Sequence, residues 1–214
     1  MKRPADCADR SRRAAKPMLV LLALAALIPV AAASDPVVGS WATYQWISSV
    51  TEEIPVLVKE PVAGGQVKWS VTRESAPPPP LYVTYSIVRG DAKTYVLQIV
   101  THQTLDGAPL SVTQVTVDRA SGKALKSVIQ RPKGTIATPE NGLRSFRQAD
   151  VKGTEEAVPV PGGRFSAVRA PHRDGTVWVS DQIPALGLVK ATFRNGQLEL
   201  VRSGTAGAKD LLRS

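Results

Sequence analysis

The chain has 214 residues, a net charge of +9, 43% hydrophobic residues and a single cysteine, Cys7. Its length suits one domain with a substantial core. One cysteine excludes an internal disulfide and a metal site built on sulfur. The positive charge is modest and no cluster of cations is interleaved with aromatics, which argues against nucleic acid as a partner.

The first 33 residues are typical of a secretory signal peptide. Residues 1–17 hold six Lys or Arg and two Asp, and residues 18–30 form an apolar run. Ala31 and Ala33 then provide the small side chains that a signal peptidase reads, so cleavage is predicted after Ala33. The run is shorter than the roughly 20 residues of a membrane-spanning helix. We therefore expect a mature chain in the periplasm or secreted, not membrane-spanning, with Cys7 removed and a net charge of +5.

Two details of export stay open. Ser11-Arg12-Arg13 resembles a twin-arginine signal, but the strongly apolar run that follows favours the general secretory route. Translation from Met18 instead of Met1 would shorten the charged segment and leave the same mature chain.

Most of the mature chain has the pattern of short strands. Turn signals about every ten residues separate runs rich in β-branched and aromatic residues, which predicts an antiparallel meander. In residues 66–74, Val67, Trp69 and Val71 alternate with polar residues, which predicts a half-buried strand with one face exposed to solvent. The expected strands cover residues 39–50, 54–59, 66–74, 81–89, 94–102, 110–117 and 123–131.

Four prolines, Pro77 to Pro80, interrupt this pattern. Because proline fixes φ and lacks an N–H donor, they predict a stiff connecting loop. A ligand for a proline-recognition domain is the alternative. Thr138-Pro139-Glu140 has the signature of a helix start, and a strand over residues 143–149 is the competing interpretation. Residues 206–214 are expected to form a frayed helical turn or a disordered tail.

Residues 158–204 contain three extended segments and the strongest hairpin signal. Asn195-Gly196 is expected at the centre of a two-residue type I′ turn, where both residues need positive φ. In the following strand, Leu198 and Leu200 share one face. The fold prediction is a single mainly β domain over residues 34–205: an antiparallel, strongly bent sheet or half-open β-barrel with at most one or two short helices. A β-sandwich is the alternative.

The sequence contains few residue patterns that are typical of catalytic sites. The mature chain has two histidines, His102 and His172, and no spacing that suggests a metal site. The adjacent pairs Glu52-Glu53 and Glu155-Glu156 point to opposite faces of their strands, so neither pair can flank one glycosidic bond. No nucleophile elbow or phosphate-binding glycine loop is present. We therefore expect no enzyme activity and no cofactor, with a hydrolase as the least favoured alternative.

The aromatic residues of the expected strands admit two interpretations. They fill a core, or they line a concave apolar cavity that holds one hydrophobic ligand. Under the second interpretation, the predicted ligand-lining residues are Trp41, Trp46, Trp69, Val71, Tyr85, Ile87, Tyr95, Leu97 and Trp178.

Two stretches near the C-terminus carry a family resemblance. Residues 153–167 resemble a G-x-E-x-V-x-V-P-x-G-x-F-x-A pattern, and residues 177–190 resemble W-x-S-x-x-V-P-x-x-G-L-V-K. Both are similar to exported bacterial β-rich relatives of the lipoprotein-carrier (LolA/LolB-like) group. The resemblance covers about residues 153–204 and implies a half-barrel whose concave face binds acyl chains. It transfers no catalytic residue.

The leading functional expectation is a soluble exported binding protein that holds an apolar small molecule or a lipoprotein on its concave face. The alternative is a structural or protein-interaction module of the cell envelope, which recognises a partner through strand edges or the proline loop.

Overall fold

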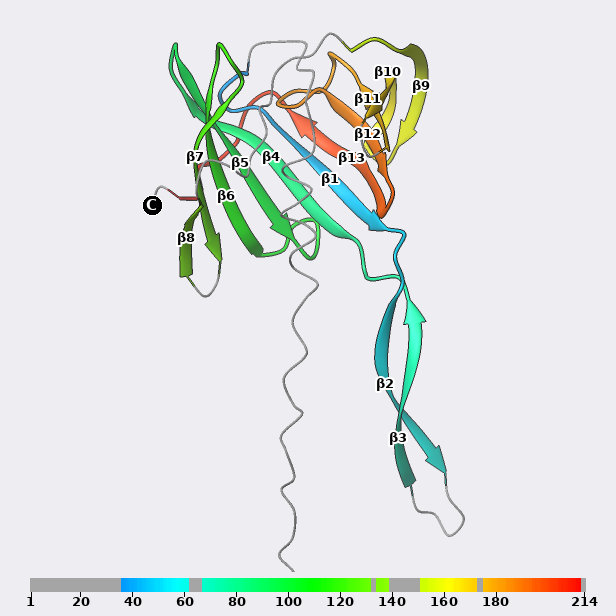
Figure 1. Cartoon of the computed structure of the whole chain (residues 1–214). Coiled ribbons are helices and arrows are strands. Elements are labelled where there is room, and N and C mark those ends of the chain that lie inside the picture. Colours follow the sequence, from blue (N-terminus) through cyan, green and yellow to red (C-terminus); the bar gives the residue numbers. More distant parts are fainter. Residues whose placement is uncertain (1–35, 62–66, 132–133, 139–150, 173–174, 213–214) are drawn as a thin grey trace, which may run out of the picture.

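The computed structural model describes residues 36–61, 67–131, 134–138, 151–172 and 175–212, and these ranges contain strands and no helix. Figure 1 shows their arrangement. The thirteen strands are β1 (Trp41–Ser48), β2 (Glu52–Pro61), β3 (Val67–Ala76), β4 (Leu81–Gly90), β5 (Thr94–His102), β6 (Pro109–Asp118), β7 (Ala124–Arg131), β8 (Gly134–Thr138), β9 (Thr154–Val160), β10 (Gly163–His172), β11 (Gly175–Val179), β12 (Leu188–Phe193) and β13 (Gly196–Gly204).

Eleven strands form one sheet in the order β8-β7-β6-β5-β4-β1-β13-β12-β11-β10-β9. Every neighbouring pair is antiparallel. Two meanders, β4–β8 and β9–β13, therefore flank β1, which joins them by pairing with β4 on one side and β13 on the other. Consecutive strands pair because short turns favour antiparallel neighbours.

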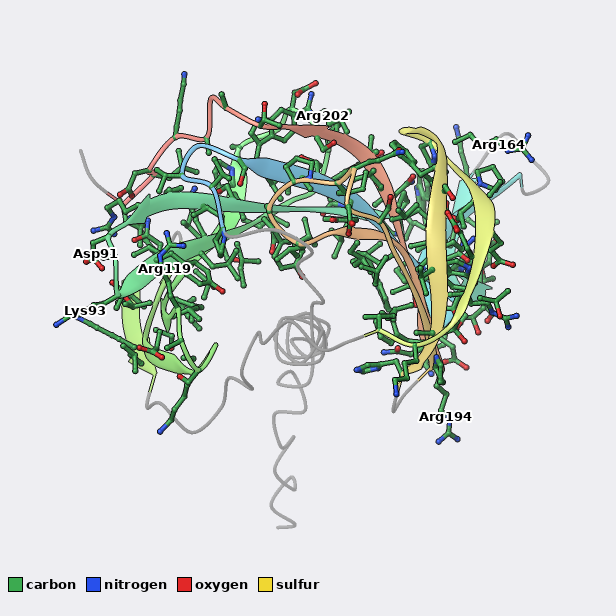
Figure 2. All side chains as sticks on the ribbon, turned by 90° about the horizontal axis from the view of Figure 1, so that it is seen from above. Asp91, Lys93, Arg119, Arg164, Arg194 and Arg202 are labelled. Atoms are coloured by element: carbon green, nitrogen blue, oxygen red, sulfur yellow. The ribbon has the colours of Figure 1, made fainter. Side chains whose placement is uncertain are left out.

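The sheet is strongly bent (Figure 2). At the β9 end the sheet bends far enough that the Gly162 amide, in the β9–β10 turn, donates a 2.9 Å hydrogen bond to the Leu200 carbonyl of β13. The outermost strands β8 and β9 are not paired with each other, so the described part of the sheet is not closed into a barrel. The prediction of a mainly β, strongly bent antiparallel sheet is confirmed, and a sandwich does not form.

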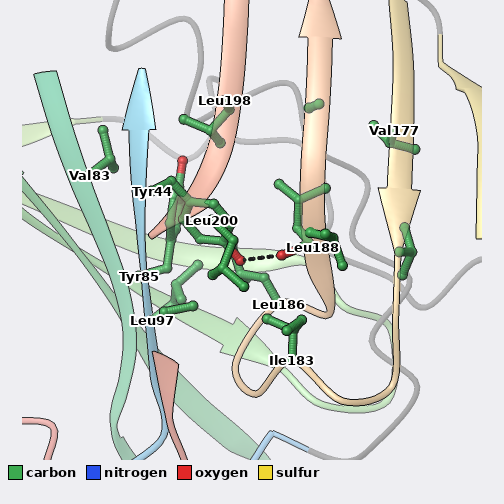
Figure 3. Close-up of a cluster of buried hydrophobic side chains, with 14 of the residues drawn as sticks. Tyr44, Val83, Tyr85, Leu97, Val177, Ile183, Leu186, Leu188, Leu198 and Leu200 are labelled. Atoms are coloured by element: carbon green, nitrogen blue, oxygen red, sulfur yellow. Dashed lines mark hydrogen bonds between the residues drawn. The ribbon is translucent and has the colours of Figure 1, made fainter. Parts of the chain in front are cut away.

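The core lies on one face of the bent sheet. Alternate residues of the central strands point to it, as the period of two requires. Tyr44, Leu97, Leu198 and Leu200 are each at most 1% exposed, and the buried Ile183 and Leu186 of the β11–β12 connection pack into the same cluster (Figure 3). The shared face predicted for Leu198 and Leu200 is confirmed.

A hairpin of β2 and β3, called the arm here, lies outside this sheet (Figure 1). Its strands pair with each other over ten positions, from Glu52↔Ala76 to Pro61↔Val67. The strand expected for residues 66–74 is confirmed as β3, but the expected burial of one of its faces is wrong, because Trp69 is 57% exposed and Val71 is 66% exposed. Alternation in the sequence shows that a strand has an apolar face, but it cannot show whether a second layer covers that face.

Three further predictions have definite outcomes. The loop expected at Pro77 to Pro80 is confirmed, since these residues connect β3 to β4 without regular structure. The three extended segments expected over residues 158–204 are instead the five strands β9–β13. The type I′ turn at Asn195-Gly196 is wrong: Phe193 pairs with Gly196, so Arg194 and Asn195 are the two turn residues, and Asn195 does not have a positive φ.

Gly196 has a different role from the predicted one. Its φ is 156°, and a Cβ there would lie 2.7 Å from Cζ2 of the Trp46 indole. Glycine is therefore required because the first residue of β13 passes directly beside a large side chain of β1. The predicted signal peptide with its cleavage site, and residues 139–149 of the predicted helix or strand, lie outside the described residues.

Candidate functional site

The predicted ligand-lining residues do not form one surface. Five of them share the core face of neighbouring strands in the large sheet: Trp46, Tyr85, Ile87, Tyr95 and Leu97. Trp178 packs at the edge of this cluster, and its indole N–H donates to a carboxylate oxygen of Glu156. Trp41 points to the other face of β1, where its N–H donates to the Ala206 carbonyl at 3.0 Å. Trp69 and Val71 lie on the arm.

The five core-face residues are in contact with the protein's own side chains. Each is at most 7% exposed. Tyr85 meets Tyr44 edge to face, with ring centroids 5.7 Å apart, and the Tyr44 hydroxyl donates to the Leu188 carbonyl at 2.9 Å (Figure 3). Burial, with a smaller contribution from Tyr85, raises the pKa of the Tyr44 phenol well above its ordinary value. This geometry is that of a packed core.

The connection between β11 and β12 covers part of this core face. It is closed by hydrogen bonds from Ser180 N to Gly187 O (2.7 Å) and from Gly187 N to Ile183 O (3.1 Å). Ala185 adopts a φ of 66°, a left-handed conformation that is unfavourable for a residue with a Cβ. The connection therefore holds Ile183 and Leu186 in the cluster at some cost in backbone strain.

The arm carries the most exposed apolar surface of the described residues. Leu57, Trp69 and Val71 are 61%, 57% and 66% exposed. Val71 pairs with Leu57 across the two strands, and Trp69 lies two residues from Val71, so all three side chains project from one face of the hairpin. We call these three residues the apolar stripe.

Charged residues border the apolar stripe on the same face. Lys59 pairs with Trp69 across the hairpin, and Arg73 lies two residues beyond Val71. The Arg73 guanidinium meets the Glu53 carboxylate at 3.2 Å, and both side chains are more than two-thirds exposed. An ion pair this exposed contributes little to stability. This ion pair lies at the end of the apolar stripe nearer the sheet, and Lys59 lies beside Trp69 at the other end.

The base of the arm is attached firmly to the sheet. β1 and β4, which the arm connects, are neighbours in the sheet and pair up to Trp46↔Leu81. On the β1 side, the Ser49 amide donates to the Asn195 carbonyl at 3.0 Å. On the β4 side, the arm returns through the four prolines. A tied strand end and a stiff proline segment together fix where the arm leaves the sheet.

Sequence reasoning placed Trp69 and Val71 with the residues of the large sheet and missed Leu57 and Lys59. The signal for these two was present. The run 54–59 and the run 66–74 are separated by Gly64-Gly65, and pairing them as a hairpin brings Leu57 opposite Val71. Nothing in the sequence indicated that the hairpin formed by these two runs lies outside the large sheet.

Comparison with known proteins found no match among protein-family models, curated proteins or solved structures. Among the described residues there is no helix with the length and hydrophobicity needed to cross a bilayer. The same residues contain no group of three or more His, Cys, Asp or Glu side chains arranged to hold a metal ion.

Proposed function

We propose that this protein is an exported lipid-binding module that places the apolar stripe of its arm at the boundary between lipid headgroups and acyl chains. The observation that carries the proposal is the position of Leu57, Trp69 and Val71, all more than half exposed on one face of a hairpin outside the sheet. The predicted signal peptide and the resemblance of residues 153–204 to lipoprotein carriers support it.

The chemistry of the stripe fits this boundary better than it fits water. A two-stranded hairpin is marginally stable alone, and a layer against its apolar face would stabilise it. Indole rings favour the headgroup level of membranes, and a neighbouring lysine can keep its ammonium group among the headgroups while its stem lies along apolar surface. Trp69 and Lys59, paired across the arm, have this arrangement.

The size of the stripe predicts weak, reversible attachment. Burying one large apolar side chain completely is worth about 1.5–3 kcal/mol. Three side chains that are each already partly buried therefore supply about 4 kcal/mol, which corresponds to a dissociation constant on the order of 1 mM. Binding should accordingly be sought at millimolar lipid.

Tryptophan fluorescence in the presence of lipid vesicles tests the proposal. Trp69 is the most exposed tryptophan that the structure describes, so its transfer into the headgroup region should shift the emission of the mature protein to the blue. Trp69→Ser should abolish the shift and the co-sedimentation with vesicles, whereas Trp41→Phe, on the large sheet, should preserve both. Wild-type protein that neither shifts nor co-sediments at several millimolar neutral or anionic lipid would refute a lipid partner. Binding that Trp69→Ser leaves intact would refute the role of the arm.

The core face supports a second candidate function, the binding of an apolar ligand. The specific observation is that the strained β11–β12 connection inserts Ile183 and Leu186 into the cluster that also contains Tyr85 and Leu97. An acyl chain would occupy the volume of these two side chains after the connection swings out. Leu186→Ala should then increase the uptake of a fluorescent fatty acid several-fold. Equal uptake, or none, by folded wild-type and variant proteins would remove this candidate.

A further inference from the structure

The C-terminal segment lies on the outer face, which we define as the face of the sheet opposite the core cluster. Gln98 lies between Leu97 and Ile99 on β5, and Gln114 lies next to Val115 on β6, so alternation directs both amides away from the core. Even so, Gln98 is 2% exposed and Gln114 is 7% exposed. They are buried because residues 205–212, called the tail, run across them.

Two side chains of the sheet bind the carboxylate of one aspartate in the tail. The Asp210 carboxylate meets the Arg89 guanidinium at 2.7 Å and accepts a 2.7 Å hydrogen bond from the Gln114 amide. Arg89 in turn donates to the other end of the Gln114 amide at 2.6 Å. The Asp210 side chain is 14% exposed and the Arg89 side chain 34%, so this pair is less exposed to water than the ion pair of the arm.

A β-bulge places the arginine. The β4–β5 register shifts between Ile87 and Arg89, and Ile87 points into the core. Without the bulge, Arg89, two residues further on, would point there too. The extra residue turns Arg89 to the outer face beside Gln114, which is why its role is not visible in the alternation of the sequence.

The remaining hydrogen bonds between the sheet and the tail involve the backbone of the tail rather than its side chains. Gln98 donates from Nε2 to the Lys209 carbonyl and accepts at Oε1 from the Leu211 amide, both at 2.9 Å. The Ala208 amide donates to the Gly39 carbonyl at 2.9 Å, and the Ala206 carbonyl accepts from Trp41. A glutamine that donates and accepts in this way reproduces the peptide group of a neighbouring strand.

The tail is therefore held mainly by polar contacts that another peptide could make. Leu211 remains 46% exposed, so nearly half of its surface is left in solvent. At the start of the tail, Gly207 has a φ of 94°, and no atom lies within 4 Å of a Cβ built on it. The tail is joined to the sheet by separate hydrogen bonds and one ion pair rather than by a strand ladder, so it opens more easily than the sheet beneath it.

We propose that Arg89, Gln98 and Gln114 form a binding site for an extended peptide that carries an aspartate, and that the tail occupies this site in cis. The backbone contacts accept any sequence, and the paired Arg89 and Gln114 select the carboxylate. Because the tail is tethered, its effective concentration at the site is on the order of millimolar, so a partner peptide binds only by displacing it. This site is separate from the arm and does not depend on the lipid proposal.

The test uses two full-length mature variants and a fluorescent peptide with the sequence of residues 205–212. In Asp210→Lys, the lysine of the tail is repelled by Arg89, so the tail is released and the binding site on the sheet stays intact. In Arg89→Glu, the new carboxylate repels Asp210 and also removes the cation from the binding site. Peptide binding is measured by anisotropy. Circular dichroism and a thermal transition confirm that both variants fold, and digestion by a carboxypeptidase reports the release of the tail.

Asp210→Lys should bind the peptide at least tenfold more tightly than the wild-type protein, in which the tethered tail competes. Arg89→Glu should not bind it, and a peptide with lysine in place of the aspartate should bind Asp210→Lys at least tenfold more weakly. Folded Asp210→Lys with a released tail and no affinity for the peptide would overturn the proposal. A tail that stays protected in Asp210→Lys, or equal binding of both peptides, would show that the carboxylate is not read and would overturn it as well.

Discussion

The hydroxyl of Tyr44 donates a 2.9 Å hydrogen bond to the carbonyl of Leu188, a residue 144 positions later in the chain. Tyr44 belongs to β1, at the junction of the two meanders, and Leu188 begins β12 directly after the strained connection that carries Ile183 and Leu186. Both residues are at most 1% exposed. This bond fixes the place where the β11–β12 connection covers the core.

Tyr44→Phe removes this bond and preserves the ring. We expect the free energy of unfolding to fall by about 1–3 kcal/mol, because a buried carbonyl loses a donor in a place that water does not reach. Denaturant unfolding of the protein measures the change. Tyr82→Phe, at a partly exposed tyrosine of β4, is the matched control. A change below about 0.5 kcal/mol for Tyr44→Phe would contradict the structural role assigned to the bond.

The buried tyrosines should make the fold sensitive to alkali. Burial raises the pKa of both Tyr44 and Tyr85 above the ordinary value of about 10. Because the folded state favours the neutral phenol, the stabilisation is complete below about pH 10 and is lost as the pH rises further. Absorbance of phenolate should show these two tyrosines ionising only together with unfolding, as followed by circular dichroism. Ionisation of all tyrosines with the sheet intact would contradict their burial.

Two turn aspartates should make the fold sensitive to acid. Backbone amides of Thr94 and Lys93 donate to Asp91 and lower its pKa, and the Ser121 hydroxyl and amide do the same for Asp118. Their contribution is present above the unfolded pKa of about 3.9 and is lost as the pH falls through the lower folded values. The double variant Asp91→Asn, Asp118→Asn should therefore lose less stability than wild type between pH 5 and 2. Asp181→Asn, at another exposed turn, controls for the loss of one surface carboxylate and is compared with each single variant.

Truncation of Trp46 should destabilise the fold strongly, whereas truncation of Trp69 should leave its stability almost unchanged. Trp46 is 6% exposed and packs on Phe193 with ring centroids 6.1 Å apart, so Trp46→Ala should cost about 3–5 kcal/mol. Trp69 lies on the arm with more than half of its surface exposed, so Trp69→Ala should change global stability by less than about 0.5 kcal/mol. Urea titrations of both variants provide the comparison. A large cost at Trp69 would show that the arm packs against the sheet.

Gly196→Ala should lower the stability of the fold far more than Gly207→Ala. In Gly196→Ala the new Cβ meets the Ile47 carbonyl and lies 2.7 Å from the Trp46 ring, whereas in Gly207→Ala it meets nothing within 4 Å. Both glycines have positive φ, 156° at Gly196 and 94° at Gly207, so backbone strain does not by itself favour Gly207→Ala. We expect Gly196→Ala to lower the free energy of unfolding by at least about 2 kcal/mol more than Gly207→Ala. Equal effects would contradict the close approach of β13 to β1.

The strands were predictable because their signal is local. Alternation and turn residues located β5 at Thr94–His102 and placed Leu198 and Leu200 on one buried face. Errors arose where a single residue shifts the register. Asn195-Gly196 has the composition of a type I′ turn, yet the pairing of Phe193 with Gly196 moves the turn by one position. The bulge before Arg89 is a second shift of this kind, at an arginine whose face was not predicted.

The candidate site was less predictable than the fold. Trp46, Trp69 and Trp178 belong to strands of the same composition, but one is buried, one stands on the arm and one lies at the edge of the core. Nothing in the sequence near residues 205–212 indicates that Gln98 and Gln114 bind this segment, because those contacts join residues about a hundred positions apart.

The sequence by itself determined that this chain forms antiparallel strands, because the spacing of apolar residues and turns sets strand faces and antiparallel order locally. Only the tertiary structure decided which apolar faces are covered. It buries Tyr85 beneath the β11–β12 connection, leaves Trp69 in solvent and lays the tail over Gln98. The reason is physical: burial depends on what a long chain brings opposite each face, and a period of two residues carries no information about that partner.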